Sequence, residues 1–237
     1  MDTGLLLFVA FALVAAAIAY FGWLGAKRRR EEFAAFAASQ GWQYAADDSS
    51  WVGRWAGRPF GTGDQPRAQN VVTGVRDGRK IVGFDYSYET YHHDSDGNRH
   101  TTTHRYGVCA MALPVPLPGL EVTAESLFDR MANALGFDDI ELESEEFNRR
   151  FRVRGEDRKF ASDVLHPQLM EVLLRYGDVG WRIEGDTLVC WDDGKHSPGE
   201  VLARLALLDA IADRIPGFVW RDHGADPELA DPGEGAQ

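Results

Sequence analysis

The first long pattern in the chain is an apolar stretch near its N-terminus. Residues 4–26 read GLLLFVAFALVAAAIAYFGWLGA and carry no charged side chain. A helix of this length spans about 34 Å, enough to cross a bilayer core of roughly 30 Å. A secretory signal peptide would have a basic leader, whereas Asp2 precedes this stretch, and the A-x-A at 15–17 lies inside the apolar run. The pattern therefore predicts a single transmembrane helix over 4–26.

Four basic residues follow this stretch directly, namely Lys27, Arg28, Arg29 and Arg30. Because no Lys or Arg precedes it, the positive-inside rule places the N-terminus outside and the rest of the chain in the cytoplasm, at the inner (plasma) membrane. These cations either only stop transfer of the chain across the membrane, or they also bind anionic lipid headgroups. Attraction to such headgroups is worth about 1 kcal/mol for each cation. All four are our candidate lipid contacts, and the bilayer is the first expected partner.

Helical periodicity continues past the membrane over residues 27–40. Phe33, Phe36 and Ala37 share one face, and Gly41 is typical of a left-handed helix stop. The pattern predicts a juxtamembrane helix that precedes a cytoplasmic domain over 41–221.

Alternating β-branched and aromatic residues then predict antiparallel strands. Residues 68–76 and 80–90 are joined by Asp77-Gly78, a typical two-residue hairpin turn. The chain turns again within 91–104 and returns over 101–113. We expect the prolines of LPVPLPGL, at 113–120, to end this meander, because proline cannot donate to a strand ladder. The body could also divide into two halves there.

The remaining sequence mixes helical and strand patterns. The fold class predicted for the whole chain is α+β, with an N-terminal transmembrane helix and a cytoplasmic, mostly antiparallel sheet covered by about three helices. The expected elements are a helix at 124–135, strands at 140–147 and 151–157, a helix broken at His166-Pro167, a hairpin at 179–193 turning at 184–186, a helix opened by the capping box Ser197-Pro198-Gly199-Glu200, and a disordered acidic tail at 222–237.

The densest group of potential metal ligands is YHHDSDGNRHTTTH, at 91–104. His100 and His104 have a spacing that suits zinc on a helix, but three consecutive threonines favour a strand. Four residues of a strand span roughly 13 Å, so one ion cannot reach both rings. We expect a solvated hairpin tip here.

The expected turn decides which histidines could meet. With Asp96-Gly97 as the central residues, His93 faces His100, on the sheet face opposite to Phe84, Tyr86 and Tyr88. Two ligands on an exposed tip do not make a closed site. His93 and His100 are therefore weak metal candidates only, and we expect no metal and no other cofactor.

Composition narrows the function classes. The net charge is −12, with 37 acidic against 25 basic residues, which argues against a nucleic-acid binder. Cys109 and Cys190 lie in apolar strand-like runs, as buried reduced thiols do, and neither has a histidine at motif spacing. No G-x-S-x-G or H-E-x-x-H occurs in the sequence. We name no catalytic residue, and an enzyme is the less favoured reading.

Several segments together resemble a family of uncharacterised, N-terminally anchored bacterial proteins. They are the apolar run with KRRR, GWQY at 41–44, RPFGTG at 58–63, FDYSY at 84–88, LPVPLPGL, and FNRRFRV…DRKFASDVLHPQLMEVLL within 147–174. The resemblance covers most of residues 4–220, and the last block is its most specific part. That family has no assigned activity, so the resemblance implies the architecture and no site residues.

These patterns leave three hypotheses for function. The first is an interaction or scaffold domain held at the inner face of the membrane, with a protein partner that the sequence does not name. The second is a ligand-binding or sensory domain with an aromatic groove made by Trp42, Trp51 and Trp55, for which core packing is the alternative. The third is a metal-dependent enzyme using the hairpin at 93–104.

Overall fold

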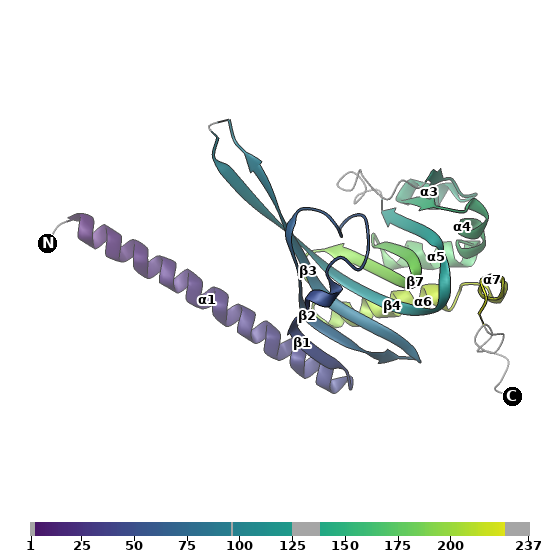
Figure 1. Ribbon diagram of the computed structural model, residues 1–237, viewed down its shortest axis with the longest axis horizontal. Coiled ribbons are helices and arrows are strands. Elements are labelled where there is room, and N and C mark those ends of the chain that lie inside the picture. The colour runs from purple at the N-terminus through teal and green to yellow at the C-terminus, as the bar shows by residue number, and fades with distance from the viewer. Residues whose placement is uncertain (1–2, 96, 125–137, 226–237) are drawn as a thin grey trace.

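One long helix dominates the N-terminal part of the molecule (Figure 1). The computed structural model describes residues 3–95, 97–124 and 138–225. α1 (Thr3–Ser39) has 37 residues, about 55 Å of helix, and joins the two predicted helices without a break. Its apolar part is exposed and is long enough to cross a membrane. Gly41, at φ 69°, follows its end as predicted.

The body is built on a single sheet, in which every described pairing is antiparallel. Across the described residues, seven strands have the order β1-β2-β3-β4-β6-β5, with β7 paired to β4. The predicted α+β fold is thus confirmed. The strands are β1 (Gln43–Asp47), β2 (Asp64–Arg76), β3 (Arg79–His93), β4 (Arg99–Ala124), β5 (Asp138–Ile140), β6 (Phe151–Gly155) and β7 (Gly180–Asp193).

The middle of the sheet differs from the prediction in two ways. β4 does not end at 113–120 but runs through it, and its prolines fall where pairing with β7 is interrupted: Pro114 and Pro116 between Ala112 and Leu117, and Pro118 between Leu117 and Leu120. The predicted hairpin at 179–193 is also wrong. β7 is one strand paired along β4, and Gly185, at φ 60°, marks a shift of register instead of a turn. β4 and β7 therefore pass through the region where the body could have divided.

Predictions made from helix-capping residues are confirmed more often than predictions made from strand-like patterns. α6 begins at Ser197 with the predicted capping box, and a break at His166 separates α4 from α5. Residues 145–147, the end of the strand predicted at 140–147, instead begin α3, because Ser144 caps this helix. β4 occupies Thr123 and Ala124, and the rest of the helix expected at 124–135 lies outside the described residues. The helices are η1 (Ser49–Trp51), α3 (Glu145–Arg150), α4 (Arg158–Val164), α5 (Pro167–Tyr176), α6 (Pro198–Ala212) and α7 (Gly217–Asp222).

The C-terminal region is only partly described. Arg221 and Asp222 lie in α7, and Ala225 is buried, so the first residues of the predicted tail belong to the folded body. The rest of that tail lies outside the described residues.

The two faces of the sheet bury different side chains. One face packs against α1 and α6 through mostly aliphatic residues, and Phe33 and Ala37 of α1 and Leu205 of α6 are fully buried there. The other face carries an aromatic cluster in which Trp55 stacks on Phe84, 6.1 Å between ring centres. The sheet thus receives α1 on its aliphatic face.

The β3–β4 hairpin extends beyond the rest of the sheet (Figure 1). Pairing of β3 with β2 ends at Glu89, and pairing of β4 with β7 ends at Tyr106. We call residues 90–104 the arm. Figure 1 shows the arm and the exposed part of α1 projecting from the same end of the body.

Candidate functional site

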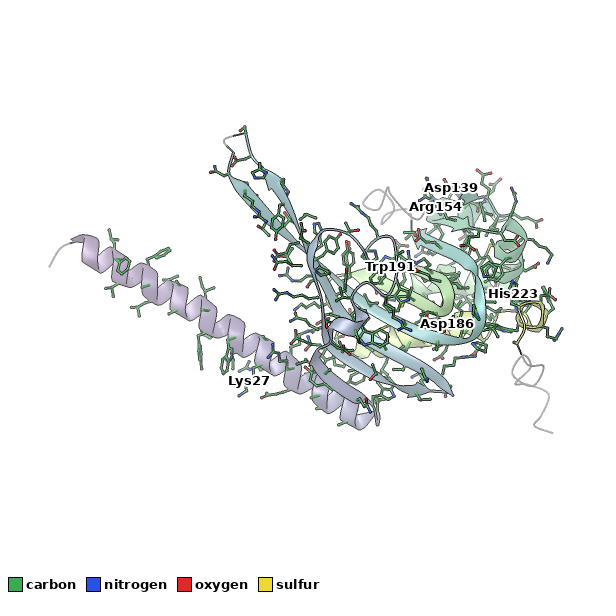
Figure 2. All side chains as sticks on the ribbon, in the orientation of Figure 1. Lys27, Asp139, Arg154, Asp186, Trp191 and His223 are labelled. Atoms are coloured by element: carbon green, nitrogen blue, oxygen red, sulfur yellow. The ribbon has the colours of Figure 1, made fainter. Side chains whose placement is uncertain are left out.

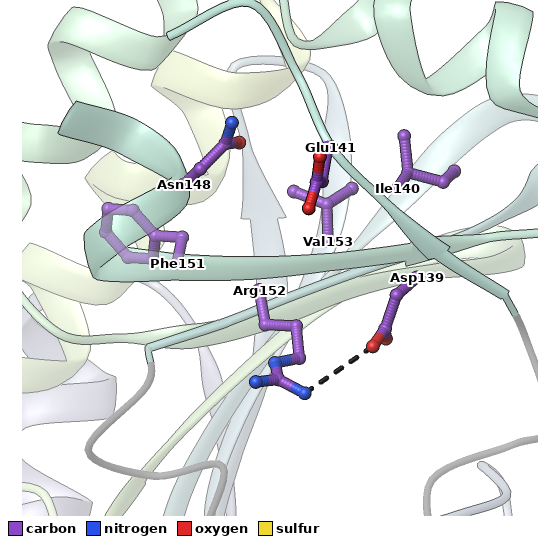
Figure 3. Close-up of a pocket in the computed structure, with 7 residues that line it drawn as sticks. All are labelled: Asp139, Ile140, Glu141, Asn148, Phe151, Arg152 and Val153. Carbon is purple, nitrogen blue, oxygen red and sulfur yellow. Dashed lines mark hydrogen bonds and ion pairs between the residues drawn. The ribbon is translucent and has the colours of Figure 1, made fainter. Parts of the chain in front are cut away.

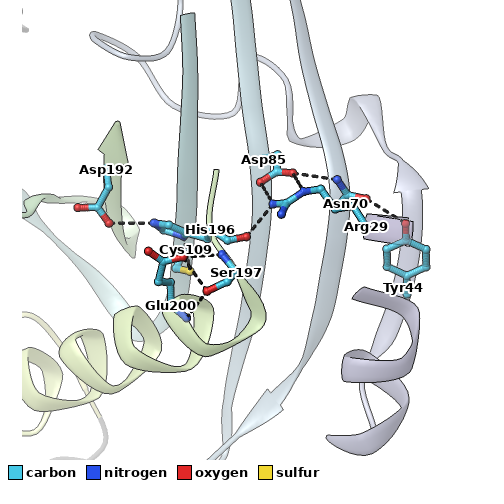
Figure 4. A network of polar contacts seen from close by, with 9 residues as sticks. All are labelled: Arg29, Tyr44, Asn70, Asp85, Cys109, Asp192, His196, Ser197 and Glu200. Atoms are coloured by element: carbon cyan, nitrogen blue, oxygen red, sulfur yellow. Dashed lines mark hydrogen bonds and ion pairs between the residues drawn. The ribbon is translucent and has the colours of Figure 1, made fainter. Parts of the chain in front are cut away.

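α1 is fixed to the body by Arg29, one of the four predicted lipid contacts (Figure 4). Its guanidinium binds both carboxylate oxygens of Asp85 on β3, at 2.8 and 3.0 Å. It also donates to the carbonyl oxygen of His196, 2.6 Å away, in the loop before α6. The Asp85 side chain is only 5% exposed, so water competes weakly for this bidentate pair. One side chain thereby links α1, the sheet and the loop before α6.

Two further side chains complete the surroundings of Asp85. Asn70 on β2 donates to Asp85 Oδ2 at 2.8 Å, and Tyr44 on β1 donates to the Asn70 side-chain oxygen at 3.1 Å. Asn70 has φ 50°, a left-handed conformation that asparagine tolerates, at a register shift of β2. Burial raises the pKa of Tyr44, so its hydroxyl stays a donor.

The network continues from His196 into the sheet. His196 Nε2 lies 2.8 Å from Asp192 Oδ2, and Arg204 of α6 also binds Asp192. The imidazole lies against Gly107, where a Cβ would come within 2.2 Å of the ring. We call Arg29, Asp85, Asn70, Tyr44, His196 and Asp192 the docking network.

Cys109 gives this network the outline of a Cys-His-Asp triad. Its Sγ lies 3.9 Å from His196 Nδ1, on the side of the ring away from Asp192. A nucleophilic cysteine needs a lowered pKa and access for substrate. Here burial raises the pKa of the Cys109 thiol, as does its neighbour Cys190, and the side chain is fully buried. The arrangement therefore serves packing, in agreement with the sequence expectation of buried thiols.

The other three predicted lipid contacts are all exposed. The Lys27 ammonium nitrogen lies 3.8 Å from a carboxylate oxygen of Glu31 and over the ring of Trp23. Arg28 and Arg30 are also open to solvent. Figure 2 shows Lys27 on α1 close to where the helix reaches the body. Lipid contact by Lys27, Arg28 and Arg30 stays a prediction, whereas Arg29 is turned toward Asp85.

The arm has a different register from the one predicted. A three-residue loop follows Asp94, with Gly97 N donating to Asp94 O, and His100 pairs with His92 while His93 pairs with Arg99. A one-residue slip exchanges the two faces of a strand. His100 therefore lies on the face of Tyr88, opposite to His93.

This register separates the two metal candidates. His100 Nε2 instead lies 2.9 Å from Asp94 Oδ2. In the part of the chain that the structure describes, no group of three or more His, Cys, Asp or Glu could hold a metal ion.

The tryptophans named as a groove divide between the two cores. Trp42 packs on Phe36 of α1, whereas Trp51 and Trp55 stack in the aromatic cluster. An apolar cavity of about 120 Å³ remains beside Trp51 and Trp55, and a neighbouring polar depression of about 360 Å³ continues along Glu184 to Thr187. The apolar cavity is smaller than most small-molecule sites, so core packing describes these rings better.

Two further cavities are polar. One, of about 190 Å³, lies between β5, α3 and β6 at the end of the body away from α1 (Figures 1 and 3). Its Arg152 is 3.5 Å from Asp139, which also binds Arg154. The other, of about 220 Å³, lies at the root of the arm beside Asp85. The second cavity adjoins the docking network.

Comparison with known proteins adds a likeness in fold. No protein-family model matches the chain, and no curated protein matches it. A similar solved structure is the crystal structure of the mycobacterial trehalose monomycolate transport factor A, TtfA, with a TM-score of 0.60 and 16% sequence identity. The alignment covers 86% of this chain and 98% of that chain. At this identity the likeness shows the fold alone.

Proposed function

We propose that the protein is a membrane-tethered cytoplasmic interaction domain, an accessory factor that meets its partner at the inner surface of the bilayer. The observation that carries this proposal is the continuity of α1. The helix passes without a break from its exposed apolar stretch to Arg29, Phe33 and Ala37, which are bound to the body. With no flexible linker between them, the body keeps a set orientation to the membrane.

The exposed cations after the apolar stretch support a cytoplasmic location of the body. Lys27, Arg28 and Arg30 lie directly after the apolar stretch, where the positive-inside rule retains the following chain in the cytoplasm. The structural neighbour is named a transport factor, which supports an accessory role in a transport process at the membrane.

The arm is the element we propose as the partner contact. Beyond Glu89 and before Tyr106 its two outer edges pair with no other strand among the described residues. Free strand edges can bind an extended segment of another chain through main-chain hydrogen bonds. Because the arm and the exposed part of α1 project from the same end of the body, the proposed partner is an integral membrane protein with an extended cytoplasmic segment.

Site-specific photo-crosslinking in cells tests this proposal. A crosslinking residue replaces Thr102, exposed on the arm, and a matched one replaces Glu171, exposed on α5. We expect position 102 to give one reproducible adduct with an integral membrane protein, and position 171 to give none. A reporter at the C-terminus should be active on the cytoplasmic side. Equal adducts from both positions, or a reporter active only outside, would contradict the proposal.

A further inference from the structure

The cavity at the root of the arm lies on the same sheet face as the docking network. Its floor includes a row across three strands, in which Arg67 of β2 pairs with Ser87 of β3 and Ser87 pairs with Arg105 of β4. Lys195, in the loop before α6, lines the same cavity. The volume is about 220 Å³, roughly seven times the space that one water molecule takes in the liquid. It can therefore hold a small charged group.

The cations of this cavity are unpaired, whereas its acids are engaged. Among the described residues, Arg67, Arg105 and Lys195 have no ion pair or hydrogen bond from their side chains. Asp85 is bound by Arg29 and Asn70, and Glu89 accepts a hydrogen bond from the Tyr91 hydroxyl at 2.9 Å. The cavity thus has an excess of positive charge with free donors, which favours an anion.

Its position indicates where that anion comes from. Ser87 is two residues along β3 from Asp85, about 7 Å, in the direction of the arm. Asp85 itself holds Arg29, two residues from Lys27, where the predicted membrane boundary lies. The arm and the exposed part of α1 project from the same end of the body. In the orientation that we propose, the cavity at the root of the arm is therefore on the side that faces the bilayer.

We infer that this cavity binds the phosphate of an anionic phospholipid headgroup. Arg67 and Arg105 present planar forks that suit phosphate oxygens, and Lys195 adds a third cation. The Ser87 hydroxyl and the side chain of Gln65 can bind hydroxyl groups of a glycerol headgroup. The inference rests on the membrane-facing orientation of the proposed function, and it does not depend on the protein partner.

Thermal unfolding of the full-length protein in detergent micelles tests it, because a ligand that binds the folded state raises the unfolding temperature. The probes are dioctanoyl phosphatidylglycerol, dioctanoyl phosphatidylcholine and inorganic phosphate. We expect phosphatidylglycerol to raise the unfolding temperature in a saturable manner, and phosphatidylcholine and inorganic phosphate to have little effect at equal concentration.

Matched variants locate the site. Arg67→Gln and Arg105→Gln should each weaken phosphatidylglycerol binding about tenfold, because each removes a charge-assisted contact. Arg221→Gln, which removes an exposed arginine of α7 at the other end of the body, should bind as the wild type does. If the strand variants do not fold, Lys195→Gln in the loop gives the same test.

Three outcomes would overturn the inference: no shift with phosphatidylglycerol, equal shifts in all variants, or equal binding of inorganic phosphate, which would assign the cavity to a soluble anion. These failures are separable from failure of the proposed function. A cytoplasmic reporter and an arm crosslink would stand without lipid binding, whereas an external C-terminus would remove the proposed function whatever the lipid result.

Discussion

α1 and the arm both project from the same end of the body, but they are held in opposite ways. In the docking network, Arg29 binds Asp85 of β3 and the carbonyl oxygen of His196 before α6, and Asn70 of β2 holds Asp85 in turn. The arm exposes His92, His93 and His100, and its His100–Asp94 contact lies in solvent, with the His100 side chain 59% exposed. Exposed ion pairs contribute little, whereas a pair removed from water depends on every partner. A dense run of chemically active residues is therefore a weaker sign of a structural or functional centre than a few well-buried ones.

The largest expected effect is at the buried face of α1. Phe33→Ala should destabilise the folded body by about 3–4 kcal/mol, because the side chain is fully buried against the sheet. Phe21→Ala, on the exposed part of the same helix, should change the free energy of unfolding by less than about 0.5 kcal/mol. Denaturant unfolding of the full chain in detergent measures both. If both variants lost the same unfolding free energy, the contrast between the buried and the exposed part of α1 would be wrong.

A second variant tests the packing of His196. Gly107→Ala places a Cβ 2.2 Å from the imidazole and should cost about 1–3 kcal/mol. Gly199→Ala, in the first turn of α6, meets no atom within 4 Å and should be neutral or slightly stabilising. The same unfolding measurement compares them, and a neutral Gly107→Ala would show that His196 is free to move.

The cap of α6 gives a smaller effect with a pH dependence. Ser197→Ala should cost about 1 kcal/mol, since Ser197 accepts from Glu200 N. The Ser197 side chain and its backbone N–H lower the pKa of Glu200 below its ordinary 4.5. A lowered folded pKa means that the ionised carboxylate stabilises the fold above pH 4.5 and that this contribution is lost as the pH falls through the folded pKa.

Glu200→Gln should therefore be less stable than the wild type at neutral pH and converge with it in acid. Unfolding curves at several pH values measure this difference. A stability difference between the two proteins that stays constant or widens on acidification would contradict the stabilising role of the ionised Glu200 carboxylate.

The arm should show the smallest effect on stability. His100→Ala and Thr102→Ala should each change the free energy of unfolding by less than about 0.5 kcal/mol, because both side chains are exposed. Chemical denaturation is again the measurement. A loss above 1 kcal/mol at His100 would show that the arm is packed more tightly than its exposure indicates.

Local signals in the sequence predicted local structure well. The apolar stretch, the Asp77-Gly78 turn, the Ser197 capping box and the break before Pro167 each depend on neighbouring residues, and each is found in the structure. The arm register failed because a two-residue and a three-residue loop both fit the same Asp-Gly signal. The loop choice then shifted every partner by one residue.

The docking network could not be predicted from local pattern. Arg29 and Asp85 are separated by 56 residues, and Arg29 and His196 by 167. No motif links them. Helical spacing does set Arg29 apart from the cations beside it, because Arg29 precedes Phe33 by four residues and so lies on the predicted face of Phe33 and Ala37. Asp85, a charged residue flanked by apolar and aromatic residues in β3, is a second signal that could have indicated a buried partner. Likewise, β7 was mistaken for a hairpin because its partner β4 lies about 75 residues earlier.

A double-mutant cycle between Arg29 and Asp85 tests the central claim most directly, since that claim is that a largely buried polar contact fixes α1 to the body. The free energy of unfolding is measured for the wild type, Arg29→Ala, Asp85→Ala and the double variant, with Arg28→Ala as the control for losing a cation of α1. The account predicts a coupling energy of about 2 kcal/mol or more, within the range of contacting residues. Additive losses, within about 0.5 kcal/mol, would contradict it and leave α1 attached by apolar packing alone.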